Sequence, residues 1–360
     1  MKALVLISVG AAALGLAAAP AAADEFDGPD CTGIYYDSEG QVIDYLFGAC
    51  TRGRINQHTM AYTVEALNRA LARSFDIETE AQKPDVAELD VIVGEGVHAK
   101  AVADAPASAA ETRWNSWIDG KYTYNDANNI AFNQDGDMFN GLAGIDYKLT
   151  SKFTVGVMAS AESTDLKGPV SGLNTSGVGI GPYIGYTLGS HIVLSSSLIG
   201  TTIDTKQNDV LNNYRYSSDR LQFSAGANGY WYLGAWRVTP GLNFSWSKEW
   251  LREKSNLLPD HYVEVAMLTP SFQLGRTLKL SEMVAVEPWA GAALDWSFVN
   301  AVKYNGTPAM DEPTRDLRVQ AGLNFTIGKQ TQLSFTGELG GLINGFVRTY
   351  SGEANLAIQF

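Results

Sequence analysis

The chain has 360 residues, of which 45% are hydrophobic, 36 are glycine and two are cysteine. Its net charge of -13 and its pI near 4.8 argue against a nucleic-acid partner, which would require a basic face. After the first 23 residues no stretch offers 18 uncharged apolar residues, so membrane-spanning helices are excluded from that part of the sequence.

The N-terminus has the layout of a secretory signal peptide. Lys2 is followed by an apolar run from Ala3 to Ala19, and the small residues Ala21 and Ala23 fit a cleavage site. We therefore expect residues 1–23 to be removed after passage through the Sec translocon. The alternative is a transmembrane anchor, but the run is rich in alanine and glycine and short for a bilayer span.

Residues 24–95 form a small N-terminal region of mixed composition. It holds both cysteines, Cys31 and Cys50, and we predict a disulfide between them because an exported chain meets an oxidising compartment. Closing a loop of this size would stabilise the folded region by about 3 kcal/mol. The alternative is two unpaired thiols.

An amphipathic helix is predicted from Arg54 to Phe75 within this region. Apolar residues recur at spacings of three and four and form one stripe: Met60, Val64, Leu67, Leu71 and Phe75. Such a stripe favours packing against the rest of the protein over binding to a membrane surface. Further on, residues 96–113 are rich in alanine, are interrupted by Pro106, and are expected to form a linker or a pore helix.

From Trp114 to the C-terminus, apolar and polar residues alternate, so that successive side chains would point to opposite faces of a strand. Twelve such strands are predicted, and they start near Trp114, Met138, Phe153, Asn174, His191, Arg220, Ala235, His261, Val284, Asp316, Thr331 and Thr349. Strands of this length span a bilayer when tilted, and an open sheet edge in lipid would leave backbone groups unpaired. The prediction for residues 114–360 is an all-β fold, a 12-stranded antiparallel transmembrane β-barrel that follows the small helix-containing N-terminal region. The barrel is predicted to lie in the outer membrane of a Gram-negative bacterium.

The connections between the predicted strands alternate in length. Those after even strands are short, at Thr150–Lys152, Gly189–Ser190, Gly234 and Gly328–Gln330. Those after odd strands are long, at Asn125–Asp137, Asp204–Ser218, Lys248–Asp260 and Val299–Arg315. Outer-membrane barrels have short periplasmic turns and longer external loops, so both ends of the barrel are predicted to lie on the periplasmic side.

Four prolines fit the predicted strands poorly, because each removes a donor from the hydrogen-bond ladder. They are Pro182, Pro240, Pro270 and Pro288. We expect them to mark bulges or positions near the periplasmic rim.

The alternation also predicts which charged side chains face the barrel interior. The predicted lumen-lining residues are Asp119, Lys121, Asp146, Arg237, Glu287, Asp295, Arg318, Glu338 and Glu353. One interpretation is that these groups pair with a threaded segment or select solutes. The alternative is that they are simply the solvated inside of a barrel.

Several short motifs follow one another in this region: the strand Trp114–Tyr124, the blocks Asn140–Asp146 and Phe153–Val157, the glycine-aromatic stretch Gly181–Tyr186, and the terminal Leu356, Ile358 and Phe360. With these motifs, residues 113–360 resemble the autotransporter β-domain, the translocator barrel of type V secretion. The resemblance implies a helix through the pore and an N-terminal passenger exported to the cell surface. It also implies that Leu356, Ile358 and Phe360 form a signal for the outer-membrane barrel assembly machinery. We expect a monomer in contact with outer-membrane lipid.

The sequence departs from that family in its N-terminal region. Residues 24–113 are few for a passenger, and they contain no internal repeat of the kind from which long passengers are built. The adjacent asparagines Asn128 and Asn129 fall in the first external loop rather than in a pore helix. We therefore predict that the chain does not cleave itself.

Catalysis is not expected. Only His261 would lie at the external rim near a hydroxyl and a carboxylate, Ser247 and Asp260, and such a grouping occurs in any polar loop. No cofactor motif and no metal-ligand spacing is present. The expected function is an autotransporter-type barrel that translocates or anchors a short N-terminal region at the cell surface. The alternative is a porin-like channel or structural outer-membrane protein with a periplasmic or plugging N-terminal domain.

Overall fold

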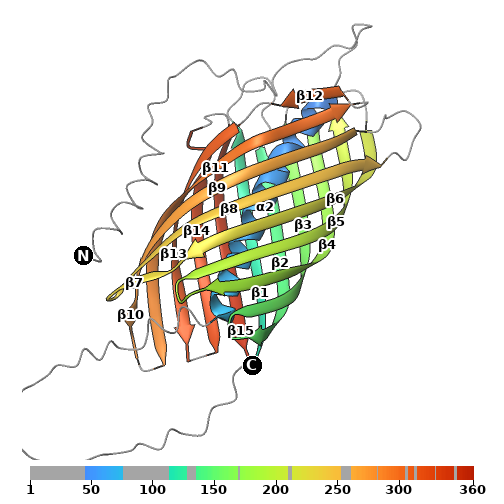
Figure 1. The fold of residues 1–360 in the computed structure, drawn as a ribbon. Helices are drawn as coiled ribbons and strands as arrows, with labels where there is room; N and C mark the ends of the chain where they lie inside the picture. Colours follow the sequence, from blue (N-terminus) through green and yellow to red (C-terminus); the bar gives the residue numbers. More distant parts are fainter. Residues whose placement is uncertain are drawn as a thin grey trace, which may run out of the picture.

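The chain folds as a closed antiparallel β-barrel with one long helix along its interior (Figure 1). The computed structural model describes residues 45–75, 113–127, 135–168, 171–209, 213–252, 261–281, 283–304, 307–311, 314–328, 330–343 and 347–360. The expected signal peptide, Cys31 and the expected linker or pore helix up to residue 112 lie outside these residues. No helix in the described ranges is long and apolar enough to cross a membrane.

Twelve strands form the barrel wall, as the sequence predicts. They are β1 (Trp114–Ala127), β2 (Asp135–Thr150), β3 (Phe153–Lys167), β4 (Ser171–Leu188), β5 (Ile192–Asp209), β6 (Asn213–Gly229), β8 (Trp236–Arg252), β9 (His261–Arg276), β11 (Val284–Tyr304), β13 (Thr314–Ile327), β14 (Thr331–Gly340) and β15 (Val347–Gln359). Three short strands extend its ends: β7 (Trp231–Leu233) pairs with β8, while β10 (Leu278–Lys279) and β12 (Thr307–Asp311) pair with β11. Each wall strand pairs with its neighbours in sequence, and β15 pairs with β1 to close the ring.

The alternation in the sequence sets which side chains face outward. In β15 the apolar Ile358 and the terminal Phe360 are exposed on the outer surface, whereas Glu353 and Asn355 are buried on the inner side. In β1, Ile118 is 58% exposed while its neighbour Asp119 is 1% exposed. An apolar exterior and a polar interior are what a barrel surrounded by lipid requires.

Short turns gather at one end of the barrel, at residues 151–152, 189–191 and 234–235 and around Gly328. Gly189, Gly234 and Gly328 have φ values of 67°, 63° and 62°, a conformation that glycine adopts without steric cost. This end is the periplasmic one, because outer-membrane barrels keep their short turns there. Both Trp114 and Phe360 lie at this end, where they exchange backbone hydrogen bonds.

At the opposite, external end the strands run further than the sequence suggests. β5 continues to Asp209 and β6 starts at Asn213, so most of the loop expected at Asp204–Ser218 is a paired hairpin. β11 likewise continues to Tyr304. The apolar alternation ends where the membrane ends, but backbone pairing continues into water because it requires no apolar face.

The four prolines keep the ladder on one side only. Pro182 pairs with β3 but not with β5, and Pro240 pairs with β9 but not with β6. Pro270 pairs with β8 and Pro288 with β13, and neither pairs with the strand on its other side. The missing proline donor is therefore accommodated by a local interruption of pairing. The β9–β11 pair also has a register shift between Ser297 and Val299.

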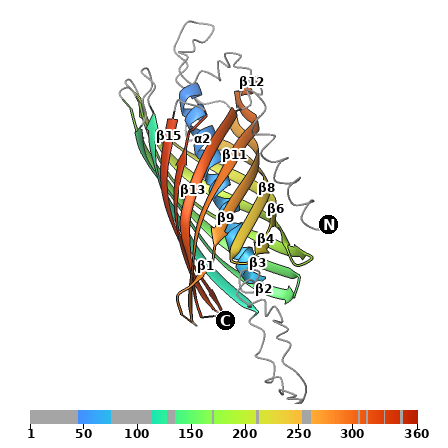
Figure 2. The same ribbon diagram turned by 90° about the vertical axis from the view of Figure 1, so that its left-hand side faces the viewer.

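The helix α2 (Tyr45–Ser74) is longer than the predicted Arg54–Phe75 segment, and its position differs from the expectation. It lies inside the barrel and does not belong to a separate small region (Figures 1 and 2). Its predicted apolar stripe packs on the wall: Leu67 and Leu71 join a cluster with Met158 and Tyr183, and Met60 contacts the residues Val263, Val265 and Met267 of β9. The sequence could show the stripe, but not the surface that it covers.

Candidate functional site

The candidate functional site is the lumen, defined by α2 and the inner face of the barrel. All nine residues predicted to line the lumen lie on this inner face. Seven are buried, and the side chains of Glu287 and Asp295 are 13% and 14% exposed. Most of them are engaged in ion pairs or hydrogen bonds with one another or with α2, so the lumen is occupied rather than open to bulk solvent.

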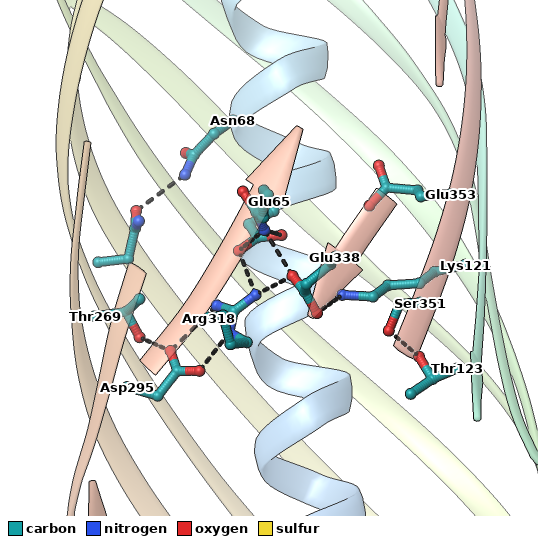
Figure 3. Close-up of polar contacts among 12 residues, drawn as sticks. Glu65, Asn68, Lys121, Thr123, Thr269, Asp295, Arg318, Glu338, Ser351 and Glu353 are labelled. Carbon is teal, nitrogen blue, oxygen red and sulfur yellow. Dashed lines mark hydrogen bonds and ion pairs between the residues drawn. The ribbon is translucent and has the colours of Figure 1, made fainter. Parts of the chain in front are cut away.

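Five charged residues form a central ion-pair cluster that joins α2 to the wall (Figure 3). They are Glu65 of α2 and Lys121, Asp295, Arg318 and Glu338 of the wall. The Arg318 guanidinium lies 2.5 Å from Asp295, 2.6 Å from Glu338 and 2.9 Å from Glu65. Lys121 Nζ lies 2.7 Å from Glu338. Because one arginine satisfies three carboxylates, its removal would leave several buried charges without compensation.

A second contact lies one helical turn further along α2. Arg69 pairs with Glu353 and lies 3.1 Å from Asp119. Asn355 of β15 donates a hydrogen bond to the same carboxylate of Asp119 at 2.8 Å. Since Glu65 and Arg69 are four residues apart, they lie on one face of α2, and this face meets β13, β15 and β1.

The N-terminal half of α2 is bound at the external end of the barrel. Arg52 pairs with Glu249 of β8, donates to Ser218 of β6 at 3.3 Å, and stacks on the Tyr216 ring with its guanidinium carbon 4.6 Å from the centroid. Asn56 Nδ2 donates to the same Glu249 at 3.1 Å. These wall residues belong to strand segments beside the external hairpins.

The C-terminal end of α2 is bound at the periplasmic end. Ser74 Oγ donates to Asp146 at 2.8 Å, a residue that precedes the β2–β3 turn. Arg73 donates to Ser334 at 3.0 Å, and its carbonyl accepts a hydrogen bond from Gln359. The helix therefore runs through the barrel with its N-terminus at the external opening and its C-terminus at the periplasmic opening.

Near the periplasmic end, aromatic rings of the wall lie over glycines of the adjacent strands. Trp117 Nε1 donates to Tyr183 Oη at 2.8 Å, and Tyr183 Oη donates to Asp146 at 2.7 Å. A Cβ on Gly144 would lie 2.5 Å from Trp117, and a Cβ on Gly156 would overlap the Tyr183 ring. Glycine is thus required at both positions to admit the rings. The resulting chain of hydrogen bonds ends on the carboxylate that holds Ser74.

A cavity of about 60 Å³ separates α2 from the wall on the side of β8, β9, β11 and β13. This volume suffices for a few water molecules. Its lining is mostly polar and includes Asn68, Arg69, Asn243, Thr269, Trp289 and Gln320. The helix is therefore packed tightly against one side of the barrel and meets a polar space on another.

The partners that α2 provides could not be seen in the pattern of the barrel strands alone. Arg52, Asn56, Glu65, Asn68, Arg69 and Arg73 all bind wall residues. Charge balance could have revealed them. The predicted lumen set contains six carboxylates and three bases, whereas the described helix carries four arginines and one glutamate.

The structure describes only some of the other residues that were predicted from the sequence. The backbone of Cys50 belongs to α2, but Cys31 lies outside the described residues, so the disulfide stays a prediction. Asn128, Asn129 and Asp260 also lie outside them; His261 begins β9, and Ser247 is buried on the inner face. Leu356, Ile358 and Phe360 line the outer face of the final strand. The described residues contain no group of three or more histidine, cysteine or acidic side chains suited to a metal ion.

A closed twelve-stranded barrel with an apolar exterior, a polar lumen and short turns at one end defines an outer-membrane β-barrel of a Gram-negative bacterium. Residues 114–252 match the model of the family described as autotransporter beta-domain. This match supports an outer-membrane barrel of the autotransporter type, and the porin-like alternative is not favoured.

Solved structures support the fold. The β-domain of the Bordetella autotransporter BrkA is 17% identical with a TM-score of 0.55, and the match covers 69% of this chain and 100% of that one. The translocator domain of NalP from Neisseria meningitidis is 15% identical with a TM-score of 0.53, covering 69% and 89%. The transport unit of AIDA-I from Escherichia coli is 11% identical with a TM-score of 0.53, covering 72% and 94%. No curated protein matches the sequence.

Proposed function

We propose that the barrel carries the segment before α2 to the cell surface and that α2 then anchors this segment in the pore. The observation that carries the proposal is the direction of α2. Arg52 is bound among Ser218 and Glu249 at the external end, whereas Ser74 is bound to Asp146 at the periplasmic end. The chain therefore enters the helix from the external opening.

An exported chain reaches the outer membrane from the periplasm. A segment that precedes an outside-to-inside helix must have crossed the barrel before that helix took its place. On this proposal, residues 24–44 are the surface-exposed part, and the surface segment is far shorter than a repeat-built passenger.

The connection between α2 and β1 is proposed to stay on the periplasmic side. Phe75 follows the periplasmic end of α2, and Arg113 lies beside the β2–β3 turn, where its carbonyl accepts a hydrogen bond from the Lys148 amide at 2.8 Å. Residues 76–112 thus join two points at the same end of the barrel. This assignment divides the predicted region 24–95 into an external and a periplasmic part.

The interior supports anchoring over solute passage. The helix binds the wall at its external end, its centre and its periplasmic end, and the described cavity beside it is small. We propose a non-enzymatic monomer that reaches the periplasm through the Sec translocon. The barrel assembly machinery would then insert it, with Leu356, Ile358 and Phe360 as the assembly signal.

Two epitope insertions test the topology. One follows Gly40 and the other follows Gln82, each in the full chain expressed in a Gram-negative host. We expect protease added to intact cells to remove the first epitope and to spare the second until the outer membrane is opened. Protection of the Gly40 epitope in intact cells would refute the surface location, and cleavage of the Gln82 epitope would refute the periplasmic connection. Heat-modifiable gel migration verifies that both insertion proteins contain a folded barrel.

A further inference from the structure

The outer face of the barrel carries an unusual pair of cations at its external end. Lys206 of β5 and Arg215 of β6 are direct partners in the antiparallel register, and both are exposed. Like charges directly opposite each other on neighbouring strands are destabilising. Among the residues that the structure describes, neither has an acidic partner. A third cation, Arg252 of β8, is 67% exposed, lies opposite Ser217 beside the same hairpin, and pairs with Asp219. We call Lys206, Arg215 and Arg252 the rim patch.

The rim patch lies above Trp250, an exposed aromatic residue of the lipid-facing surface. Trp250 is 41% exposed on the outer face of β8 and is the register partner of Asp219, which in turn faces Thr202. Along β5, Lys206 of the Lys206–Arg215 pair lies four residues (206 minus 202) beyond Thr202. At ~3.3 Å per residue that is roughly 13 Å along the strands. For strands tilted by ~45° it corresponds to roughly 9 Å of height above Thr202. Since tryptophans mark the membrane interface, the patch is at the height of lipid headgroups.

Exposed arginines at the external ends of other strands have a partner: Arg315 of β13 lies over the Trp296 ring, and Arg348 of β15 faces Asp126 in the register. The corresponding outer surface of β1, β2 and β3 carries the carboxylates Asp126, Asp135, Asp137 and Asp165. Its one lysine in the described part of these external ends, Lys167, pairs with Asp165 at 2.9 Å. In a chain of net charge -13, two facing cations without an acidic partner among the described residues call for an anionic partner from outside the chain.

We propose that the rim patch binds the phosphate groups of a phosphorylated glycolipid in the outer leaflet. Arginine and lysine are the side chains that recognise phosphate, and an anion between Lys206 and Arg215 would remove their mutual repulsion. Trp250 below the patch offers an apolar surface to the acyl chains of the same lipid. The proposal depends on the orientation of the barrel but not on export of the N-terminal region.

Binding to defined lipids tests the proposal on the purified full chain in neutral detergent micelles. The probe is a bisphosphorylated lipid A-type glycolipid carrying a fluorophore, and its anisotropy reports the affinity. Each basic residue near a lipid surface contributes about five-fold in affinity, so the double variant Lys206→Gln/Arg215→Gln should bind about 30-fold more weakly. Lys167→Gln is the matched control, because Lys167 is an exposed lysine at the external end of β3 that already has an acidic partner.

The competing outcomes are distinct. Unchanged affinity of the double variant, or an equal loss in Lys167→Gln, would overturn the proposal. Equal binding of the dephosphorylated glycolipid would show an apolar contact only. Displacement of the probe by millimolar inorganic phosphate would show a site for free phosphate instead of lipid, and would also overturn it. Because both substituted side chains lie outside the hydrocarbon layer, heat-modifiable migration should be unchanged in every variant, and the single substitutions provide a second measurement if the double variant assembles poorly.

Discussion

The two sides of α2 meet the barrel by different physical means. Toward β3, β4 and β5 the helix packs with apolar side chains, as where Leu71 fits against Gly185 and lies near Tyr183. Toward β13, β15 and β1 it is held by ion pairs of Glu65 and Arg69. Apolar packing is non-directional and excludes water, whereas a hydrogen-bonded ion pair requires one particular partner. The charged side therefore selects which wall residues α2 meets, and the apolar side contributes buried area.

Loss of Arg318 should be the most damaging change to the charged side. Arg318→Ala leaves Asp295, Glu338 and Glu65 with Lys121 as the one remaining cation of the cluster, and breaking a buried pair typically costs about 3–5 kcal/mol. Urea unfolding of the refolded barrel in detergent should show this loss. Lys167→Ala, an exposed lysine on the outer face, serves as the control and should change the free energy of unfolding little. A wild-type midpoint for Arg318→Ala would contradict a charged anchor.

Leu71→Ala should lower the free energy of unfolding by somewhat less than Arg318→Ala, because it weakens the apolar packing of α2. Leu71 is fully buried, and Leu→Ala substitutions at such sites cost about 2–5 kcal/mol. Because the ion pairs of Glu65 and Arg69 remain, the helix should stay at its position while its packing loosens. Limited proteolysis of the refolded protein would then cleave α2 faster than in the wild type, with an intact barrel. Complete protection of α2 would argue that packing does not hold it.

Filling the space over Gly156 should disturb the aromatic contact that supports this apolar side. A methyl group there overlaps the Tyr183 ring, and overpacking costs about 1–3 kcal/mol. We expect Gly156→Ala to lower the midpoint of thermal unfolding and to alter the near-ultraviolet circular dichroism of Trp117 and Tyr183. Gly352→Ala is the matched control, because a Cβ at Gly352 meets no atom within 4 Å. Equal effects of the two substitutions would refute the steric explanation.

Double-mutant cycles should give the smallest change in the free energy of unfolding, and they separate the two sides of α2 most directly. Glu65→Gln and Arg318→Gln act on one ion pair, so their effects on the free energy of unfolding should be coupled by about 0.5–3 kcal/mol. Glu65→Gln and Leu71→Ala act on different sides of the helix and should add within about 0.5 kcal/mol. If both cycles show the same coupling, the two sides of α2 do not act independently.

The barrel could be predicted from the sequence because its constraint is local. Alternation with period two marks each strand, and the lipid outside requires an apolar residue at positions such as Ile118 and Phe360. The inner face followed from the same alternation, which placed Asp119 and Glu353 inside. The external hairpins were harder to predict, since paired strands in water need no apolar pattern.

The position of α2 could not be predicted in this way. A stripe such as Met60, Leu67 and Leu71 shows that one face is buried, but the polar face of a helix looks the same whether it meets water or a charged wall. Arg69 and Arg73 therefore resembled surface residues, although both bind inside the barrel. The fit between helix and lumen is a property of the pair, and it appears only when the charges of both are counted together.

The pairing of β1 with β15, which we call the seam, also affects the order of the folding steps. The two strands pair from Asn115 with Gln359 to Ala127 with Val347, so the ring cannot shut until the last residues of the chain are available. Contacts this distant in sequence form late in folding, because the long intervening chain must first be ordered. A helix inside a ring can enter sideways before the seam forms or along the axis afterwards. Entry along the axis would move the charged side chains of Arg52 and Glu65 past the apolar cluster around Leu67, which is unfavourable. A wall that closes around a helix already in place avoids this step. The seam thus favours an order of events in which the segment before α2 crosses while β1 and β15 are still apart, α2 then takes its place, and the ring closes last.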